Sequence, residues 1–105
     1  MIELSIADIA TTVGGTLVGA PDASATVSGA VHTDSREVKP GDIFFALPGE
    51  STDGHLFAPA AVANGAALLI VQRELDVPVP QVVVADGVVA LSDLAREVVA
   101  RMSRR

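Results

Sequence analysis

A strand, helix and strand pattern in the middle of the chain dictates the fold class. The run from Ile43 to Leu47 is apolar throughout, as expected for a strand that is covered on both faces. An alanine-rich helical stretch from His55 to Asn64 follows, with Pro59 near its first turn, and Gly65 ends it. Residues 67–71 form a second apolar run. Two strands joined by a helix predict a right-handed parallel crossover, and therefore an α/β domain.

The flanking segments extend this pattern. Ser5 precedes a short helix whose apolar residues recur at helical spacing up to Gly14 and Gly15. Further strands are expected over residues 16–18, over 26–32 with an interruption at Gly29, and over 81–84, and a final helix over 91–102 packs on the sheet. We therefore expect a mixed, mostly parallel sheet flanked by helices, with the strand over 43–47 at its centre.

Length and composition exclude several classes of protein. A chain of 105 residues supports one domain, its apolar runs are far shorter than the roughly 20 residues of a membrane span, and its start lacks the features of a secretory signal. We expect a soluble, cytoplasmic protein.

The lack of cysteine excludes disulfides and thiol chemistry. A net charge of -6 and only three phenylalanines make nucleic acid an improbable partner, and the arginines near the C-terminus suit a helix end.

The sequence offers little support for an active site. His55 lacks companions at metal-ligand spacing, whether from His32 or from a carboxylate cluster. Ser35, Asp53 and His55 could form a hydrolase set, but the chain has no G-x-S-x-G elbow. It also has no G-x-x-x-x-G-K-[ST] phosphate loop, because Lys39 belongs to a type II turn over residues 39–42. We therefore expect no catalytic residue, metal site or cofactor site in this chain.

Two polar loops are candidates for ligand binding. They cover residues 33–36 and 49–55, and each follows an expected strand. If these strands are parallel neighbours, both loops leave the sheet at one edge, where open α/β sheets bind ligands. Their serine and threonine hydroxyls and glycine N–H groups suit a uracil ring or a ribose, and the guanidinium of Arg36 suits a pyrophosphate or a carboxylate. The hydroxyls of Ser35 and Thr52 are expected to be exposed.

A purely structural interpretation of the same loops stays open. Asp34 and Asp53 would then cap turns and helices, and Arg36 would pair with Asp34 or Glu37. The serines would only satisfy the backbone of the loops. On this interpretation the two loops bind no ligand.

The residues from Thr33 to Gly49 strongly resemble the first domain of the Mur ligases. The segment from Asp53 to Phe57 is similar to the family's D-G-H-x-F segment, and residues 82–86 are similar to its last strand, so that the resemblance covers nearly the whole chain. The opening residues 4–10, with Gly14 and Gly15, resemble the branch that adds D-alanyl-D-alanine (MurF) more than the branch that forms the tripeptide (MurE).

This resemblance implies roles for individual residues. In the family, the first domain binds the uridine end of a UDP-N-acetylmuramoyl-peptide, a central domain binds ATP and Mg²⁺, and a third domain presents the incoming amino acid or dipeptide. The residues implied to bind the uridine end are Thr33, Ser35, Arg36, Glu50, Ser51 and Thr52. Structural roles at the same site are implied for Asp34, Asp53, Gly54 and His55. None of these residues is implied to be catalytic.

The resemblance also implies a domain organisation and a function. Residues 1–102 would form the substrate-binding domain, and residues 103–105 would begin the linker to an ATP-binding domain that the chain lacks. The chain would recognise UDP-N-acetylmuramoyl-tripeptide for an ATP-dependent ligase of peptidoglycan precursor synthesis, and alone it would be inactive. Its partners would be this substrate and the missing ligase domains, not a membrane or nucleic acid. The alternatives are a MurE-type domain and a non-enzymatic binding or regulatory module.

Overall fold

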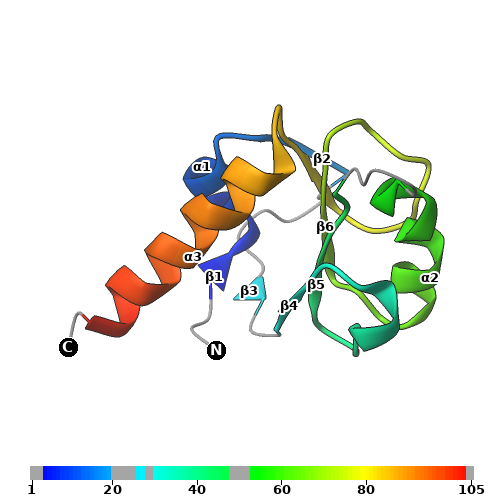
Figure 1. The fold of residues 1–105 in the computed structure, drawn as a ribbon, viewed down its shortest axis with the longest axis horizontal. Helices are drawn as coiled ribbons and strands as arrows, with labels where there is room; N and C mark the ends of the chain where they lie inside the picture. Colours follow the sequence, from blue (N-terminus) through cyan, green and yellow to red (C-terminus); the bar gives the residue numbers. More distant parts are fainter. Residues whose placement is uncertain (1–3, 20–25, 28–29, 48–52, 104–105) are drawn as a thin grey trace.

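The computed structural model describes residues 4–19, 26–27, 30–47 and 53–103, and Figure 1 shows its elements around a central sheet. Within these residues the five-stranded sheet has the order β2-β7-β6-β5-β4, and a second sheet pairs β1 with β3. Helices α1 and α3 lie on one side of the large sheet, and α2 lies on the other (Figure 1). The elements are β1 (Leu4–Ser5), α1 (Ile6–Val13), β2 (Thr16–Val18), β3 (Thr26–Val27), β4 (Val31–His32), η1 (Ser35–Glu37), β5 (Ile43–Phe45), η2 (Gly54–Phe57), α2 (Ala58–Ala63), β6 (Leu68–Val71), β7 (Gln81–Val83) and α3 (Gly87–Ser103).

The large sheet is mixed and mostly parallel, as predicted. Strands β4, β5, β6 and β7 pair in parallel, and β2 pairs antiparallel with β7 at one edge. The middle strand is β6, all four residues of which are buried, so the expectation that residues 43–47 form the centre was wrong. The crossover through α2 places β6 beside β5, and β7 and β2 then extend the sheet beyond β6. Strand β5 is nevertheless internal and buried on both faces.

The strand expected over residues 26–32 is in fact two strands in different sheets. Strand β3 pairs with β1, which places Val27 opposite Leu4, whereas β4 pairs with β5. Both Val27 and Leu4 are buried in the same core cluster as the apolar face of α1, and this burial draws the first half of the segment away from the large sheet. The expectation of one interrupted strand was therefore wrong.

The helix ends follow the local signals in the sequence. The Asp8 N–H donates to Ser5 Oγ at 3.0 Å at the start of α1, and Gly14 ends this helix with φ 66°. The helix expected over 55–64 is a 3-10 turn, η2, followed by α2, because Pro59 sits in the first turn of α2 and cannot continue an earlier hydrogen-bond ladder. Helix α3 begins at Gly87, before the apolar stripe starts, because Asp86 Oδ1 accepts from the N–H groups of its first turn.

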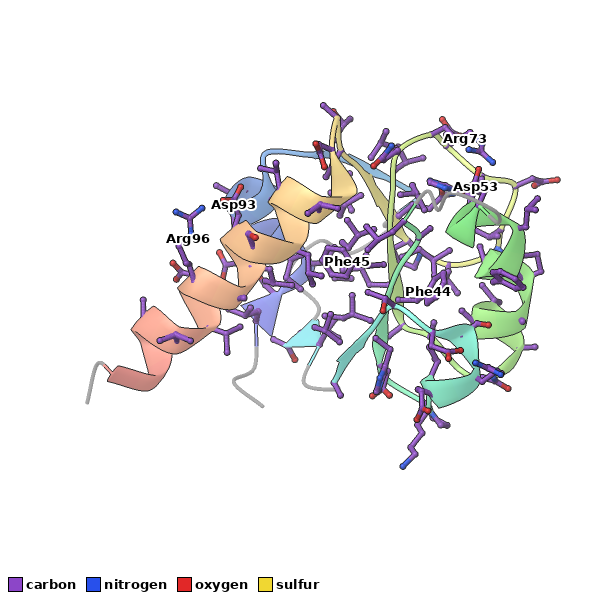
Figure 2. All side chains as sticks on the ribbon, in the orientation of Figure 1. Phe44, Phe45, Asp53, Arg73, Asp93 and Arg96 are labelled. Carbon is purple, nitrogen blue, oxygen red and sulfur yellow. The ribbon has the colours of Figure 1, made fainter. Side chains whose placement is uncertain are left out.

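The core lies on both faces of the sheet. Successive residues of a strand point to opposite faces, so Phe45 packs with the buried residues under α1 and α3, and Phe44 packs with those under η1 and α2 (Figure 2). Both side chains are fully buried. Among the described residues, no helix is long and apolar enough to span a bilayer.

Asp42 joins the turn before β5 to the start of β4. Gly41 has φ 90°, and the Asp42 N–H donates to the Lys39 carbonyl at 3.0 Å, which confirms the type II turn. The buried Asp42 carboxylate accepts from the N–H groups of Ala30 and Lys39, both at 2.9 Å, and lies 3.0 Å from His32 Nε2. Burial acts to raise the pKa of Asp42, but these hydrogen bonds outweigh it, and the pKa lies below its usual value.

Replacing Asp42 by asparagine will destabilise the domain by about 1–2 kcal/mol at pH 7, because at least one backbone donor then faces an amide NH₂. The pKa of Asp42 is lower in the folded state than in the unfolded state, where it is about 3.9, so the ionised carboxylate stabilises the fold fully at a pH above this value. The stabilisation is lost as the pH falls from there through the pKa of the folded state. The difference between wild type and Asp42→Asn in urea unfolding, followed by circular dichroism, should therefore shrink from pH 7 to pH 3. Asp76→Asn, at an exposed position, removes the same charge and should change the free energy of unfolding at pH 7 by less than about 0.5 kcal/mol. A difference that stays constant on acidification would contradict this account.

Candidate functional site

A hollow of about 640 Å³ lies between the segment after β4 and the start of α2. One wall is the first polar loop, residues 33–36, and the other wall is formed by Phe57 and Ala60. Strands β4 and β5, which precede the two polar loops, are parallel neighbours. This is the arrangement that the two loops need in order to leave the sheet at the same edge. The hollow therefore places four predicted site residues against the beginning of α2.

Arg36 and Asp34 form an ion pair within this loop. Asp34 caps η1: its Oδ1 accepts from the Arg36 N–H at 2.9 Å and from Nε at 3.1 Å, and its Oδ2 accepts from Nη2 at 2.8 Å. The side-chain and backbone hydrogen bonds of Arg36 lower the pKa of Asp34 to about 2, and Asp34 in turn raises the pKa of Arg36. The Arg36 side chain is still 86% exposed. An anionic ligand would therefore meet this guanidinium as an oriented ion pair, not as an isolated cation.

Ser35 is fixed against α2. Its residue is 7% exposed, and its carbonyl accepts from Asn64 Nδ2 at 2.9 Å. The expectation of an exposed hydroxyl was therefore wrong for Ser35, because η1 turns this residue inward onto the end of α2. Thr33 is exposed at the hollow. The role of Asn64 was not found from the sequence, since it depends on a contact with a residue far away in the chain.

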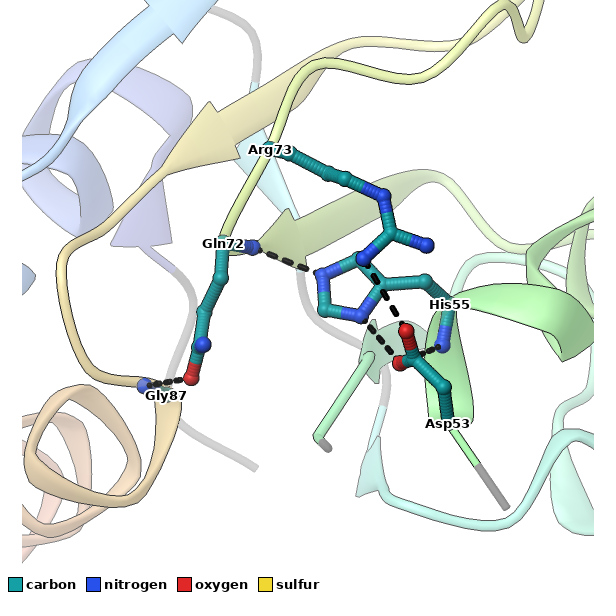
Figure 3. A network of polar contacts seen from close by, with 5 residues as sticks. All are labelled: Asp53, His55, Gln72, Arg73 and Gly87. Atoms are coloured by element: carbon teal, nitrogen blue, oxygen red, sulfur yellow. Dashed lines mark hydrogen bonds and ion pairs between the residues drawn. The ribbon is translucent and has the colours of Figure 1, made fainter. Parts of the chain in front are cut away.

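The second loop is described only in its last part. Gly49, Glu50, Ser51 and Thr52 lie outside the described residues. Asp53 caps η2, where its Oδ1 accepts from the His55 N–H at 2.9 Å and lies 2.7 Å from His55 Nδ1. Its Oδ2 accepts from Arg73 Nη1 at 3.0 Å (Figure 3). Hydrogen bonds from the backbone and ring of His55 are the main reason why the pKa of Asp53 is lowered well below its usual value.

The contacts of His55 fix its tautomer. The ring is buried, and its Nε2 lies 2.8 Å from the backbone nitrogen of Gln72 (Figure 3). A backbone N–H only donates, so Nε2 is the acceptor and the ring hydrogen is on Nδ1, from which it is donated to Asp53. Nε2 thus holds η2 to the residue that follows β6, whereas Nδ1 bonds to Asp53, the cap of the same turn. In the part of the chain that the structure describes, no three His, Cys, Asp or Glu residues gather as metal ligands.

The same network continues to α3. Gln72 Oε1 accepts from the Gly87 N–H at 2.8 Å, and the Gly54 N–H donates to the Leu47 carbonyl at 2.8 Å. These bonds tie together the segments that follow β5, β6 and β7. Gln72 and Gly87 were not found from the sequence, although a polar residue directly after a buried strand is a usable signal for such a position.

The structure separates the predicted site residues into two groups. Thr33, Asp34, Ser35 and Arg36 line the hollow, whereas Asp53 and His55 face the end of β6. Phe57 and Ala60, which follow the second loop, take the place opposite the first loop. A sequence signal for them exists, because positions 57, 60 and 64 fall on one face of a helix.

Comparison with known proteins gives consistent matches. A family model described as "Mur ligase family, catalytic domain" matches residues 28–105. The UDP-N-acetylmuramoyl-tripeptide--D-alanyl-D-alanine ligase of Mycobacterium tuberculosis is 46% identical over 81 residues, which are 74% of this chain and 16% of that protein. A UDP-N-acetylmuramoyl-L-alanyl-D-glutamate--2,6-diaminopimelate ligase of Geobacillus kaustophilus is 45% identical over 76 residues, 72% of this chain and 16% of its own length. The chain thus spans about a sixth of these relatives.

Solved structures match as well. MurF from Acinetobacter baumannii superimposes with a TM-score of 0.80 at 33% identity, over 90% of this chain and 20% of that one. MurF ligase from Thermotoga maritima in complex with ADP superimposes with a TM-score of 0.62 at 36% identity, over 66% of this chain and 16% of that one. The family model covers more than half of the chain, and the relatives and structures agree with it. The chain belongs to the Mur ligase family.

Proposed function

We propose that this chain is the substrate-recognition domain of a ligase that adds D-alanyl-D-alanine to UDP-N-acetylmuramoyl-tripeptide. The observation that carries the proposal is the hollow between residues 33–36 and α2, in a chain whose relatives are named as ligases of this substrate class. A polar wall with an exposed, oriented Arg36 suits a nucleotide diphosphate. Residues 50–52 stay part of the proposed uridine site.

We assign binding and orientation to this chain, and no chemical step. Mur ligases depend on ATP, and a related MurF structure contains ADP. The 105-residue sequence has no phosphate-binding glycine loop, and the described residues include no metal-ligand cluster. We therefore propose that these residues bind and orient the substrate and take no part in ATP or Mg²⁺ chemistry.

The proposal also covers domain bounds and location. Residues 1–102 would form the recognition domain, and residues 103–105 would begin the connection to the catalytic machinery. The whole enzyme would work in the cytoplasm, where peptidoglycan precursors and ATP meet.

The proposal predicts a localised binding response. In two-dimensional NMR titrations with UDP and with UDP-N-acetylmuramoyl-tripeptide, the amides of residues 33–36 and 49–55 should shift saturably, with a Kd of about 1 mM for the isolated chain. Arg36→Ala should weaken UDP binding by about fivefold, the effect of roughly 1 kcal/mol for an exposed ion pair. Arg96→Ala is the matched control, because Arg96 lies on α3, on the other side of the sheet (Figure 2). Unchanged spectra at millimolar UDP would contradict the proposal.

One observation favours a second candidate, a ligase that adds the third residue. The diaminopimelate ligase of Geobacillus kaustophilus is 45% identical to the chain over 76 residues, only slightly below the 46% over 81 residues of the D-alanyl-D-alanine ligase of Mycobacterium tuberculosis. Both substrates carry the same UDP end, so the titration with UDP does not separate the two candidates. Comparing UDP-N-acetylmuramoyl-dipeptide with the tripeptide as substrates of the complete enzyme would separate them.

A further inference from the structure

Phe57 differs from the other two phenylalanines of the chain. Phe44 and Phe45 are completely buried, whereas Phe57 is 45% exposed. Leaving an aromatic ring half in water forgoes much of the stabilisation that its burial would supply. Phe57 lines the hollow opposite residues 33–36, while its neighbour Leu56, 69% exposed, does not. The exposed ring is therefore placed at the candidate site.

The backbone around Phe57 is held on all sides. Phe57 ends η2, and the first residue of α2, Ala58, is completely buried and donates its N–H to the His55 carbonyl. At the other end of η2, the Gly54 N–H is hydrogen-bonded to Leu47 and Asp53 caps the turn. The buried His55 ring ties the middle of η2 to Gln72. A rigid turn therefore presents the Phe57 ring to the hollow, which lowers the entropy lost when a ligand packs on it.

The residues that line the hollow suit a planar base that carries a diphosphate. Phe57 supplies an apolar face, and Ala60, one turn later, is small and leaves room beside it. The facing loop supplies the Thr33 hydroxyl and, at its end, the exposed Arg36 guanidinium. Bases stack on aromatic side chains because both present flat, polarisable faces. A UDP molecule whose uracil ring stacks on Phe57 would have the Thr33 hydroxyl and the Arg36 guanidinium of the facing loop as partners for its polar groups.

We propose that Phe57 is a substrate-binding residue that stacks on the uracil base of the UDP-linked substrate. This inference rests on the proposed function and adds a residue to it. Phe57 acts on the base, and Arg36 acts on the diphosphate, so ligands that carry one or both groups separate the two contributions.

The test compares uridine with UDP in NMR titrations of the 105-residue chain. Phe57→Ala should weaken the binding of both ligands by about tenfold, which corresponds to about 1.4 kcal/mol and lies within the range for base stacking. Phe57→Leu, which keeps an apolar side chain but no aromatic face, should weaken both by about threefold to tenfold. Leu56→Ala is the matched control and should leave both affinities unchanged. Arg36→Ala should weaken UDP binding and leave uridine binding nearly unchanged.

A spectroscopic measurement tests the contact directly. The chain contains no tryptophan or tyrosine, so Phe57→Trp and Leu56→Trp each introduce a single fluorophore. Saturating uridine should quench the emission of the Phe57→Trp variant, because the indole ring stacks on the base, and should leave that of Leu56→Trp unchanged.

Each outcome has one meaning. If wild type binds uridine and UDP but the Phe57 variants, with native spectra, bind them equally well, the stacking role is overturned and the proposed function stands. If wild type binds neither ligand, the proposed function fails, and the role of Phe57 fails with it. If Phe57→Ala loses its native spectrum, the stacking role is judged from the affinity of Phe57→Leu and from the quenching of Phe57→Trp. Unchanged affinity and unchanged emission would then overturn it.

Discussion

Replacing His55 by leucine will destabilise the domain by about 3 kcal/mol, because it leaves the Gln72 N–H without its acceptor and removes the ring donor to Asp53. Leucine is apolar and of similar size, so the cost measures lost hydrogen bonds more than lost volume. Urea unfolding of wild type and variant, followed by circular dichroism at pH 7, gives the difference in free energy of unfolding.

Arg73→Ala is the matched control for this prediction. Arg73 bonds to the same Asp53 carboxylate, but its side chain is 55% exposed, and exposed ion pairs contribute only about 0–1 kcal/mol. The buried and exposed partners of one carboxylate should thus differ by about 2 kcal/mol in their effect. A cost below about 1 kcal/mol for His55→Leu would show that the Gln72 N–H finds another acceptor, and that His55 does not hold η2 in place.

Replacing Gly54 by alanine is expected to cost about 3 kcal/mol, because the new Cβ would lie 2.5 Å from the Leu47 carbonyl oxygen and 2.8 Å from the Leu47 nitrogen. Neither backbone atom can turn aside, so η2 must move away from the end of β5 and lose the hydrogen bond between the Gly54 N–H and Leu47. Thermal unfolding and the amide spectrum of residues 53–57 would report both effects.

Gly14→Ala separates this steric effect from the usual cost of replacing glycine. Gly14 has φ 66°, but a Cβ added there would meet no atom within 4 Å, so alanine carries only the backbone penalty of about 1 kcal/mol. Equal costs for the two variants would mean that η2 tolerates displacement. A larger cost for Gly54→Ala would mean that the backbone contact fixes the position of η2, and with it that of Phe57.

Local signals in the sequence were sufficient for most elements of the fold. The turn at Lys39–Asp42, the buried strand after it and the stop at Gly65 each depend on residues next to one another, and the structure contains all three. The position of β6 at the centre of the sheet depends on how the segments after it add to the sheet. The division of residues 26–32 between two sheets depends on the burial of Val27 against Leu4, far away in sequence.

The site shows the same division between local and distant contacts. The pairing of Arg36 with Asp34 was one of the alternatives left open by the sequence, because the two residues are neighbours in one turn. The burial of Ser35 depends on Asn64, and the link from His55 to Gln72 depends on the approach of η2 to β6. Such contacts follow from the packing of the sheet and helices, so periodicity and composition do not reveal them.

The bond between His55 and position 72 has an evolutionary consequence. His55 accepts from the backbone of residue 72, so any amino acid except proline at that position keeps this bond. The contact with Gly87, in contrast, uses the Gln72 side chain and is lost with most substitutions. Substitutions at position 72 are therefore expected to remove the hydrogen bond to the start of α3 and to keep the one that holds η2. Substitutions at position 55 are expected to remove the bond that holds η2.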